Sequence, residues 1–275
     1  MELLALFPKY FDAIRFWEDE DSGHWEETRK NEASSIGVAT AGLIELRQLL
    51  KTSGKKRQFR YQGSVVGIDL VEKLIDEGSS KLGEILPYEC IQVDPLTNRK
   101  YDAALLFLIF PMNIVDQEMA DTILNNVISN LQGEYGVRRY IGDSFWSPDY
   151  KKKLPPETRT ADFSQDISKR GSMIERGDEA QWCIFDPIIS IIYGQQYQRH
   201  PNESYFLHQQ SKYLNRSLGQ LTGAESIYGE FKCPELYYIE NGKRVPDDAT
   251  PLLWTQANLW MALHYMEKSL RLREE

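Results

Sequence analysis

Apolar residues recur at helical spacing along most of the chain. In each of several stretches they lie three and four positions apart, and polar residues fill the positions between them. This is the pattern of a helix that buries one face. It predicts amphipathic helices at residues 3–17, 31–50, 65–86, 116–131 and 202–221.

Two further stretches, 102–110 and 178–197, are apolar on all sides. The sequence DAALLFLIF at 102–110 fits either a central strand or a helix surrounded by other helices. Because its neighbours have helical period, we favour a helix. A last helix is predicted after Thr250, with Pro251 in its first turn. The alternation of one-faced and all-round apolar helices predicts two concentric rings, an α/α toroid. A helical solenoid would alternate similarly, but the chain shows no repeat of fixed period.

The segment between these helices at 133–178 is long and irregular. A loop of this length inside a compact domain is usually functional or disordered. Its first part, GEYGVRRYIGDSFW, is too aromatic for a disordered linker.

Charge limits the classes of partner. The chain of 275 residues carries 41 acidic and 32 basic residues, a formal net charge of −9. A nucleic-acid partner normally requires a clustered basic face, so we expect none. The basic run Lys55, Lys56, Arg57 and Arg60 is interpreted as a solvated turn, with Gly54 closing the preceding helix.

The three cysteines, Cys90, Cys183 and Cys233, are odd in number and widely spaced. That pattern fits neither a disulfide framework nor a zinc site, so we expect no metal or cofactor and a reducing, cytoplasmic environment. The N-terminus lacks the features of a signal peptide, and no apolar run reaches the ~18 residues of a membrane helix. We therefore expect a soluble protein with no membrane partner.

The best candidate for chemistry is the short loop SGHWEE, which ends at Glu27 just before a helix. A pyranose ring stacks its C–H face on an aromatic side chain while its hydroxyls bond to carboxylates. Trp25 beside Glu26 and Glu27 offers both contacts. The alternative is a solvated glutamate pair with Trp25 as a core anchor.

Three other loop segments, RRYIGD, GDEAQW and PELY, lie at or near predicted helix starts. In this order the four segments resemble glycoside hydrolase family 15, the glucoamylases. The resemblance implies that Glu26 is the general acid, that Glu27 holds substrate hydroxyls, and that Glu235 is the general base. It also implies sugar binding by Arg139 and Tyr140.

The similarity is closer still to the glucoamylase-like region of the phosphorylase kinase α and β subunits. NEASSIGVATAGLIEL, LQGEYGVRRY, the EAQW segment and PELY all resemble that group. We therefore expect Glu179 and Trp182 to line the same pocket as Trp25, Arg139 and Tyr140.

The resemblance implies an all-α fold, an α/α toroid of six helical hairpins. Residues 1–275 would form its C-terminal two-thirds and would lack the N-terminal helices. A partner chain or an N-terminal segment would then complete the toroid. The implied function is inverting hydrolysis of α-1,4-glucans or maltooligosaccharides, releasing glucose from chain ends. The alternative is a non-catalytic glucan-binding or regulatory module, as in the phosphorylase kinase subunits. In the hydrolase, Glu26 would need a pKa raised by burial against Trp25, whereas Glu235 would have to stay ionised.

Overall fold

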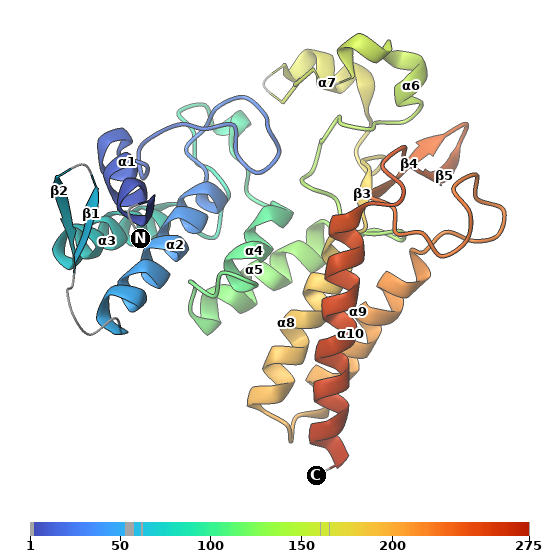
Figure 1. Ribbon diagram of the computed structural model, residues 1–275. Coiled ribbons are helices and arrows are strands. Elements are labelled where there is room, and N and C mark those ends of the chain that lie inside the picture. The colour runs from blue at the N-terminus through green and yellow to red at the C-terminus, as the bar shows by residue number, and fades with distance from the viewer. Residues whose placement is uncertain (1–2, 53–57, 62, 160, 165, 275) are drawn as a thin grey trace. The chain divides into compact units, whose positions relative to one another are not determined.

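The computed structural model describes residues 3–52, 58–61, 63–159, 161–164 and 166–274 (Figure 1). The chain divides into two compact units. The first unit comprises Met1–Lys100 and Phe107–Ala120, and the second comprises Tyr101–Leu106 and Asp121–Glu275.

The first unit is built around a pair of packed helices, α2 (Ala33–Thr52) and α3 (Ile68–Ile85). The helix α1 (Leu6–Ile14) packs on α3 and follows a single turn, η1 (Leu3–Ala5). Between α2 and α3 lies an antiparallel hairpin of β1 (Gln58–Tyr61) and β2 (Ser64–Gly67). The turn η2 (Pro95–Thr97) comes later in this unit.

Two helices, α4 (Leu106–Ile109) and α5 (Gln117–Asn130), contribute residues to both units. The remaining elements belong to the second unit. They are η3 (Ala103–Leu105), α6 (Tyr150–Lys153), η4 (Pro156–Thr158), α7 (Ile167–Met173), β3 (Gln181–Trp182), α8 (Phe185–Arg199), α9 (Ser204–Gly219), β4 (Leu236–Glu240), β5 (Lys243–Pro246) and α10 (Leu253–Glu274).

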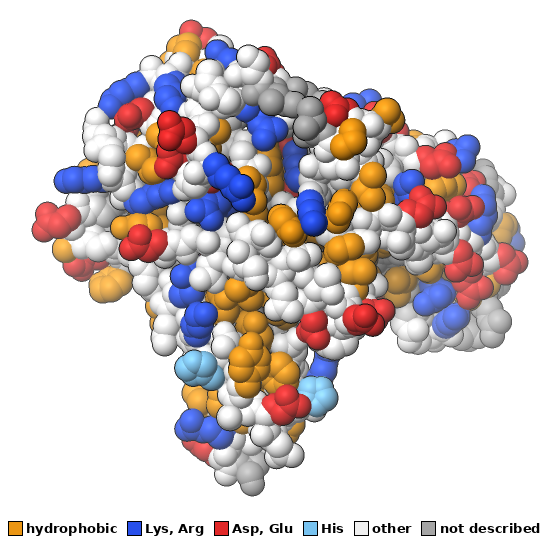
Figure 2. All heavy atoms as spheres, turned by 180° about the vertical axis from the view of Figure 1, so that it is seen from behind, with side chains coloured by type: hydrophobic (Ala, Val, Ile, Leu, Met, Phe, Trp, Pro, Cys, Tyr) orange, Lys and Arg blue, Asp and Glu red, His pale blue; other side chains and the backbone are white. Residues whose placement is uncertain are grey.

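The second unit joins three long helices to a small sheet. The helices α8, α9 and α10 pack against one another, and α8 is buried on every side along most of its length (Figure 1). The strands are antiparallel in the order β3-β4-β5. Hydrophobic side chains also reach the surface among charged ones, as Figure 2 shows for one face. The most exposed of them on α10 are Leu253 and Trp260, at 77% and 68%.

The expected all-α class is wrong. The fold is about 54% helical and contains a three-stranded antiparallel sheet, so it is mixed α/β and the expected α/α toroid is not confirmed. The physical reason lies in the sequence LYYIENGKRVP. Asn241 and Gly242 have φ values of 51° and 75°. Positive φ at both central residues is the geometry of a tight type I′ hairpin turn, which Asn-Gly strongly favours.

Most of the predicted helices exist with shifted ends. Residues 65–67 belong to β2 rather than to the helix, and 181–182 form β3 before α8 begins. The stretch 102–110 is helical, as we favoured, but short. Arg60 lies in β1 rather than in a turn, while Gly54 and the basic residues 55–57 lie outside the described residues. Within the described part of the chain, no helix is both long and apolar enough to span a bilayer.

Candidate functional site

The predicted loop around Glu26 lies in the first unit, and its two ends are held together. Two backbone hydrogen bonds close it, from the N–H of Asp21 to the carbonyl of Lys30 at 3.1 Å and in the reverse direction at 2.9 Å. Gly23 and Glu26 both adopt positive φ, at 65° and 57°. The Glu26 side chain is exposed in this loop, whereas the hydrolase interpretation expects it to be buried against Trp25.

Glu27, in contrast, belongs to a buried charge cluster. Its carboxylate pairs with the guanidinium of Arg99, and each side chain is only 8% exposed. Arg99 Nη1 also lies 3.7 Å from Glu32 Oε1. Because Glu27 is held by Arg99, this ion pair competes with any role of Glu27 in holding sugar hydroxyls. Trp25 is half-buried and makes an edge contact with the ring of His24, with centroids 4.6 Å apart.

Arg139 lies at the centre of the candidate site in the second unit. Its guanidinium donates two hydrogen bonds to Asp143, from Nε at 2.6 Å and from Nη2 at 2.7 Å. Its Cζ is 4.9 Å from the ring centroid of Phe145 and 5.0 Å from that of Trp182. The two rings stack on each other at 6.1 Å. A paired cation against aromatic faces is stable when buried, and Arg139 is 4% exposed.

Tyr140 and Glu179 position the loop that carries Arg139. The ring of Tyr140 lies 5.8 Å from Arg139 Cζ and 5.9 Å from Arg170 Cζ. The Glu179 carboxylate accepts hydrogen bonds from the N–H groups of Gly142 and Gly177, each at 2.9 Å. Glu179 is buried and lies 3.1 Å from Arg138 Nε. Through these bonds Glu179 holds the backbone in place at both Gly142 and Gly177.

Glu235 lies immediately before β4 and beside a second carboxyl group. Burial and the neighbouring Asp247 raise the pKa of Glu235 to about 7, against a smaller lowering by Arg139. Asp247 is fully buried, and burial also raises its pKa. With a pKa of about 7, Glu235 is only partly ionised at neutral pH, whereas the expected general base would stay ionised.

Five of the eight predicted site residues therefore lie in the second unit, in a network of contacts and charge interactions around Arg139. The five are Arg139, Tyr140, Glu179, Trp182 and Glu235. The other three, Trp25, Glu26 and Glu27, belong to the first unit. Asp143, Phe145 and Asp247 were missed. Asp143 follows Arg139 by four residues in the quoted segment RRYIGD, and this proximity could have indicated the pair.

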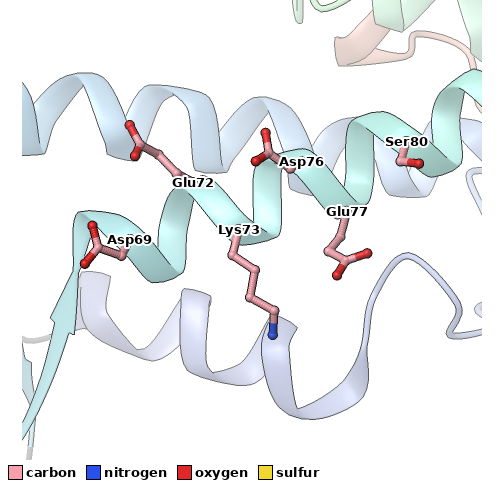
Figure 3. Close-up of a pocket in the computed structure, with 6 residues that line it drawn as sticks. All are labelled: Asp69, Glu72, Lys73, Asp76, Glu77 and Ser80. Atoms are coloured by element: carbon pink, nitrogen blue, oxygen red, sulfur yellow. The ribbon is translucent and has the colours of Figure 1, made fainter.

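The first unit also has an open surface cavity of about 630 Å³ along α3 (Figure 3). It is lined by Asp69, Glu72, Lys73, Asp76, Glu77 and Ser80. Lys73 pairs with Asp12 of α1 at 3.0 Å. The lining is a charged, solvated helix face with no aromatic side chain. This cavity is therefore a poor candidate for a sugar site.

The described residues contain no group of three or more His, Cys, Asp or Glu side chains that could hold a metal ion. All three cysteines are buried free thiols. The pKa of Cys183 is raised well above its usual value by burial, so this thiol stays protonated.

Comparison with curated proteins shows similarity to a distant relative. The chain is 27% identical over 250 residues to a Caenorhabditis elegans protein named as a probable phosphorylase b kinase regulatory subunit alpha. The match covers 86% of this chain and 18% of that protein, so this chain spans under a fifth of the relative's length. No family model matches. The match supports the resemblance to phosphorylase kinase subunits, while membership of glycoside hydrolase family 15 is not confirmed.

Proposed function

We propose that this chain is a non-catalytic regulatory module of the phosphorylase kinase type, and that it binds an α-glucan or maltooligosaccharide. The observation that carries the proposal is the match to a kinase regulatory subunit over most of the chain. As such a module, it would act by associating with a kinase chain. The buried free thiols fit the cytoplasm as its compartment.

The proposed glucan site is the network around Arg139. Phe145 is partly exposed and its ring stacks on Trp182, which gives an aromatic face for the C–H side of a sugar. Glu235 is also partly exposed and supplies a carboxyl group for sugar hydroxyls. Arg139 is held by Asp143, and it fixes the aromatic rings rather than reaching for the ligand.

A second candidate is inverting hydrolysis of α-1,4-glucans with Glu26 as acid and Glu235 as base. It is favoured by the presence of both carboxyl residues in motifs that resemble those of the glucoamylases. Glu26 is exposed, and the raised pKa of Glu235 departs from the fully ionised base that this mechanism was expected to use. We therefore place hydrolysis second.

Calorimetric titration of the purified chain with maltoheptaose tests the binding proposal. We expect saturable binding that weakens about tenfold in Phe145→Ala, because one stacked aromatic face is worth roughly 1–1.5 kcal/mol. The matched control is Tyr205→Ala on α9, an aromatic ring that is 57% exposed in the same unit. Equal loss in both variants, or no binding by the native chain, would contradict the proposed site.

A further inference from the structure

Two arginine side chains, Arg138 and Arg244, meet at one backbone oxygen on the surface of the second unit. Arg138 directly precedes Arg139 in the chain, and Arg244 belongs to β5. Nη2 of each guanidinium donates a hydrogen bond of 3.4 Å to the carbonyl oxygen of Gly177, which is exposed. The two nitrogens are therefore at most twice that distance apart. Like charges this close repel each other, and an anion bound between them would relieve the repulsion.

The carboxylates of this region neutralise the two arginines unequally. Glu179 is 1% exposed, and its Oε2 lies 3.1 Å from Nε of Arg138. Arg244 makes no ion pair with any described residue, and the nearby carboxylate of Asp178 only raises its pKa by a charge interaction. Burial and the charge of Arg138 act the other way, and together they lower the pKa of Arg244. The charge of Arg244 thus has no carboxylate in contact with it within the described part of the chain.

The hydrogen bonds of Arg244 hold its guanidinium in a fixed position. Nη1 donates to the carbonyl oxygens of Glu179 at 2.9 Å and Tyr237 at 3.4 Å. These bonds and the one to Gly177 leave Nε–H and one N–H of Nη2 with no acceptor among the described residues.

Arg138 is held in a similar way. Its Nη1 donates to the carbonyl oxygens of Leu131 at 3.4 Å and Gln132 at 3.2 Å. Its Nη2 bonds to Gly177, and the second N–H of that nitrogen has no acceptor in the described ranges. Two positioned arginines therefore offer N–H donors beside one exposed carbonyl, an arrangement that suits a ligand with several anionic oxygens.

We propose that Arg138 and Arg244 bind a phosphate monoester through the N–H groups beside the Gly177 carbonyl. A phosphate monoester carries a charge of about −1.5 to −2 at pH 7 and presents several terminal oxygens, so one phosphate group can accept bonds from both guanidinium groups. A carboxylate offers fewer oxygens and less charge. This inference does not depend on the proposed glucan binding, because an unphosphorylated glucan carries no such group.

Phosphorus-31 NMR titrations of glucose 6-phosphate and of inorganic phosphate with the full chain test the site. We expect saturable binding of the ester that weakens about tenfold in Arg244→Gln, which removes a charged donor. The matched control is Arg159→Gln. Arg159 likewise bonds to backbone carbonyls, those of Leu154 and Lys151, each at 3.2 Å, and its loss should leave the affinity unchanged. No saturable binding, equal loss in the two variants, or tighter binding of inorganic phosphate than of the ester would overturn the proposal.

Asp178→Asn tests the site by an expected gain. It removes the negative charge near Arg244, so glucose 6-phosphate should bind about threefold more tightly. Unchanged or weaker binding would place the anion elsewhere and overturn the assignment, whether or not Arg244→Gln folds. Binding of glucose 6-phosphate without any binding of maltoheptaose would refute the proposed glucan site and support the phosphate site.

Discussion

At the scale of single residues, the bonds of Arg139 decide the shape of the candidate site. Asp143 accepts two hydrogen bonds from Arg139 and a third from the backbone N–H of Phe145 at 3.0 Å. Both charged side chains are buried. Asp143 thus fixes the cation and one of the aromatic rings together.

We expect Asp143→Asn to destabilise the chain by about 3–5 kcal/mol, because it leaves the Arg139 charge buried without its partner. Urea unfolding measures the change. Glu267→Gln is the control, since it breaks an ion pair with Arg271 in which both side chains are over half exposed. That change should cost at most about 0.5 kcal/mol. Similar losses in the two variants would mean that Arg139 does not depend on Asp143.

The pH dependence of stability gives a second prediction at this scale. The folded pKa of Glu235 is about 7, above its usual 4.5. Its stabilising contribution is therefore complete below pH 4.5 and declines as pH rises to about 7, because the unfolded state releases its proton first. The unfolding free energy of the native chain relative to Glu235→Gln should fall across this window by up to about 3 kcal/mol. Chemical denaturation at several pH values checks it, and a difference that rises with pH would contradict the assignment.

At the scale of elements, helical period predicted the long helices because each buries one face, or all faces, in a core. Ile36, Leu43, Leu46 and Leu50 of α2 are buried as their spacing predicts. The strands were missed because they are short and occur beside the helices or within loops. Only the Asn241-Gly242 turn carried a local signal for a hairpin. Trp182 of β3 pairs with Leu236 of β4, which lies 54 residues further along the chain, and no local pattern could reveal this pairing.

The helix α2 contains two glycines, Gly37 and Gly42, and of these two Gly37 packs closely against neighbouring side chains. A methyl group on Gly37 would lie 2.1 Å from Leu108 Cδ2 and 3.2 Å from Ile114 Cδ1, whereas one on Gly42 would meet nothing within 4 Å. We expect Gly37→Ala to destabilise by about 1–3 kcal/mol, since Leu108 is fully buried and has little room to move.

Gly42→Ala on the same helix is the matched control. It should stabilise the chain by about 0.5–1 kcal/mol, because alanine favours the helix without meeting a neighbour. Thermal unfolding of both variants compares them directly. A stability change of the same sign in both variants would show that α2 does not pack closely at Gly37.

At the scale of the whole molecule, motif order predicted that four loop segments gather, but it could not determine their chemical state. The segments around Arg139, Glu179 and Glu235 do meet in the second unit. The sequence could not reveal that burial and the nearby Asp247 raise the pKa of Glu235 or that Arg99 pairs with Glu27, since Asp247 and Arg99 lie outside the motifs. The proposed regulatory module rests on the match to a phosphorylase kinase regulatory subunit rather than on these two contacts.

Proton NMR of maltoheptaose in the presence of the purified chain tests this function most directly, because one sample reports both binding and cleavage. Saturation transfer from protein to sugar protons detects binding, and new anomeric signals of free glucose detect hydrolysis. We predict saturation transfer that Phe145→Ala reduces, with no glucose released over a day. Glucose release that disappears in both Glu26→Gln and Glu235→Gln would contradict a non-catalytic module and establish a hydrolase.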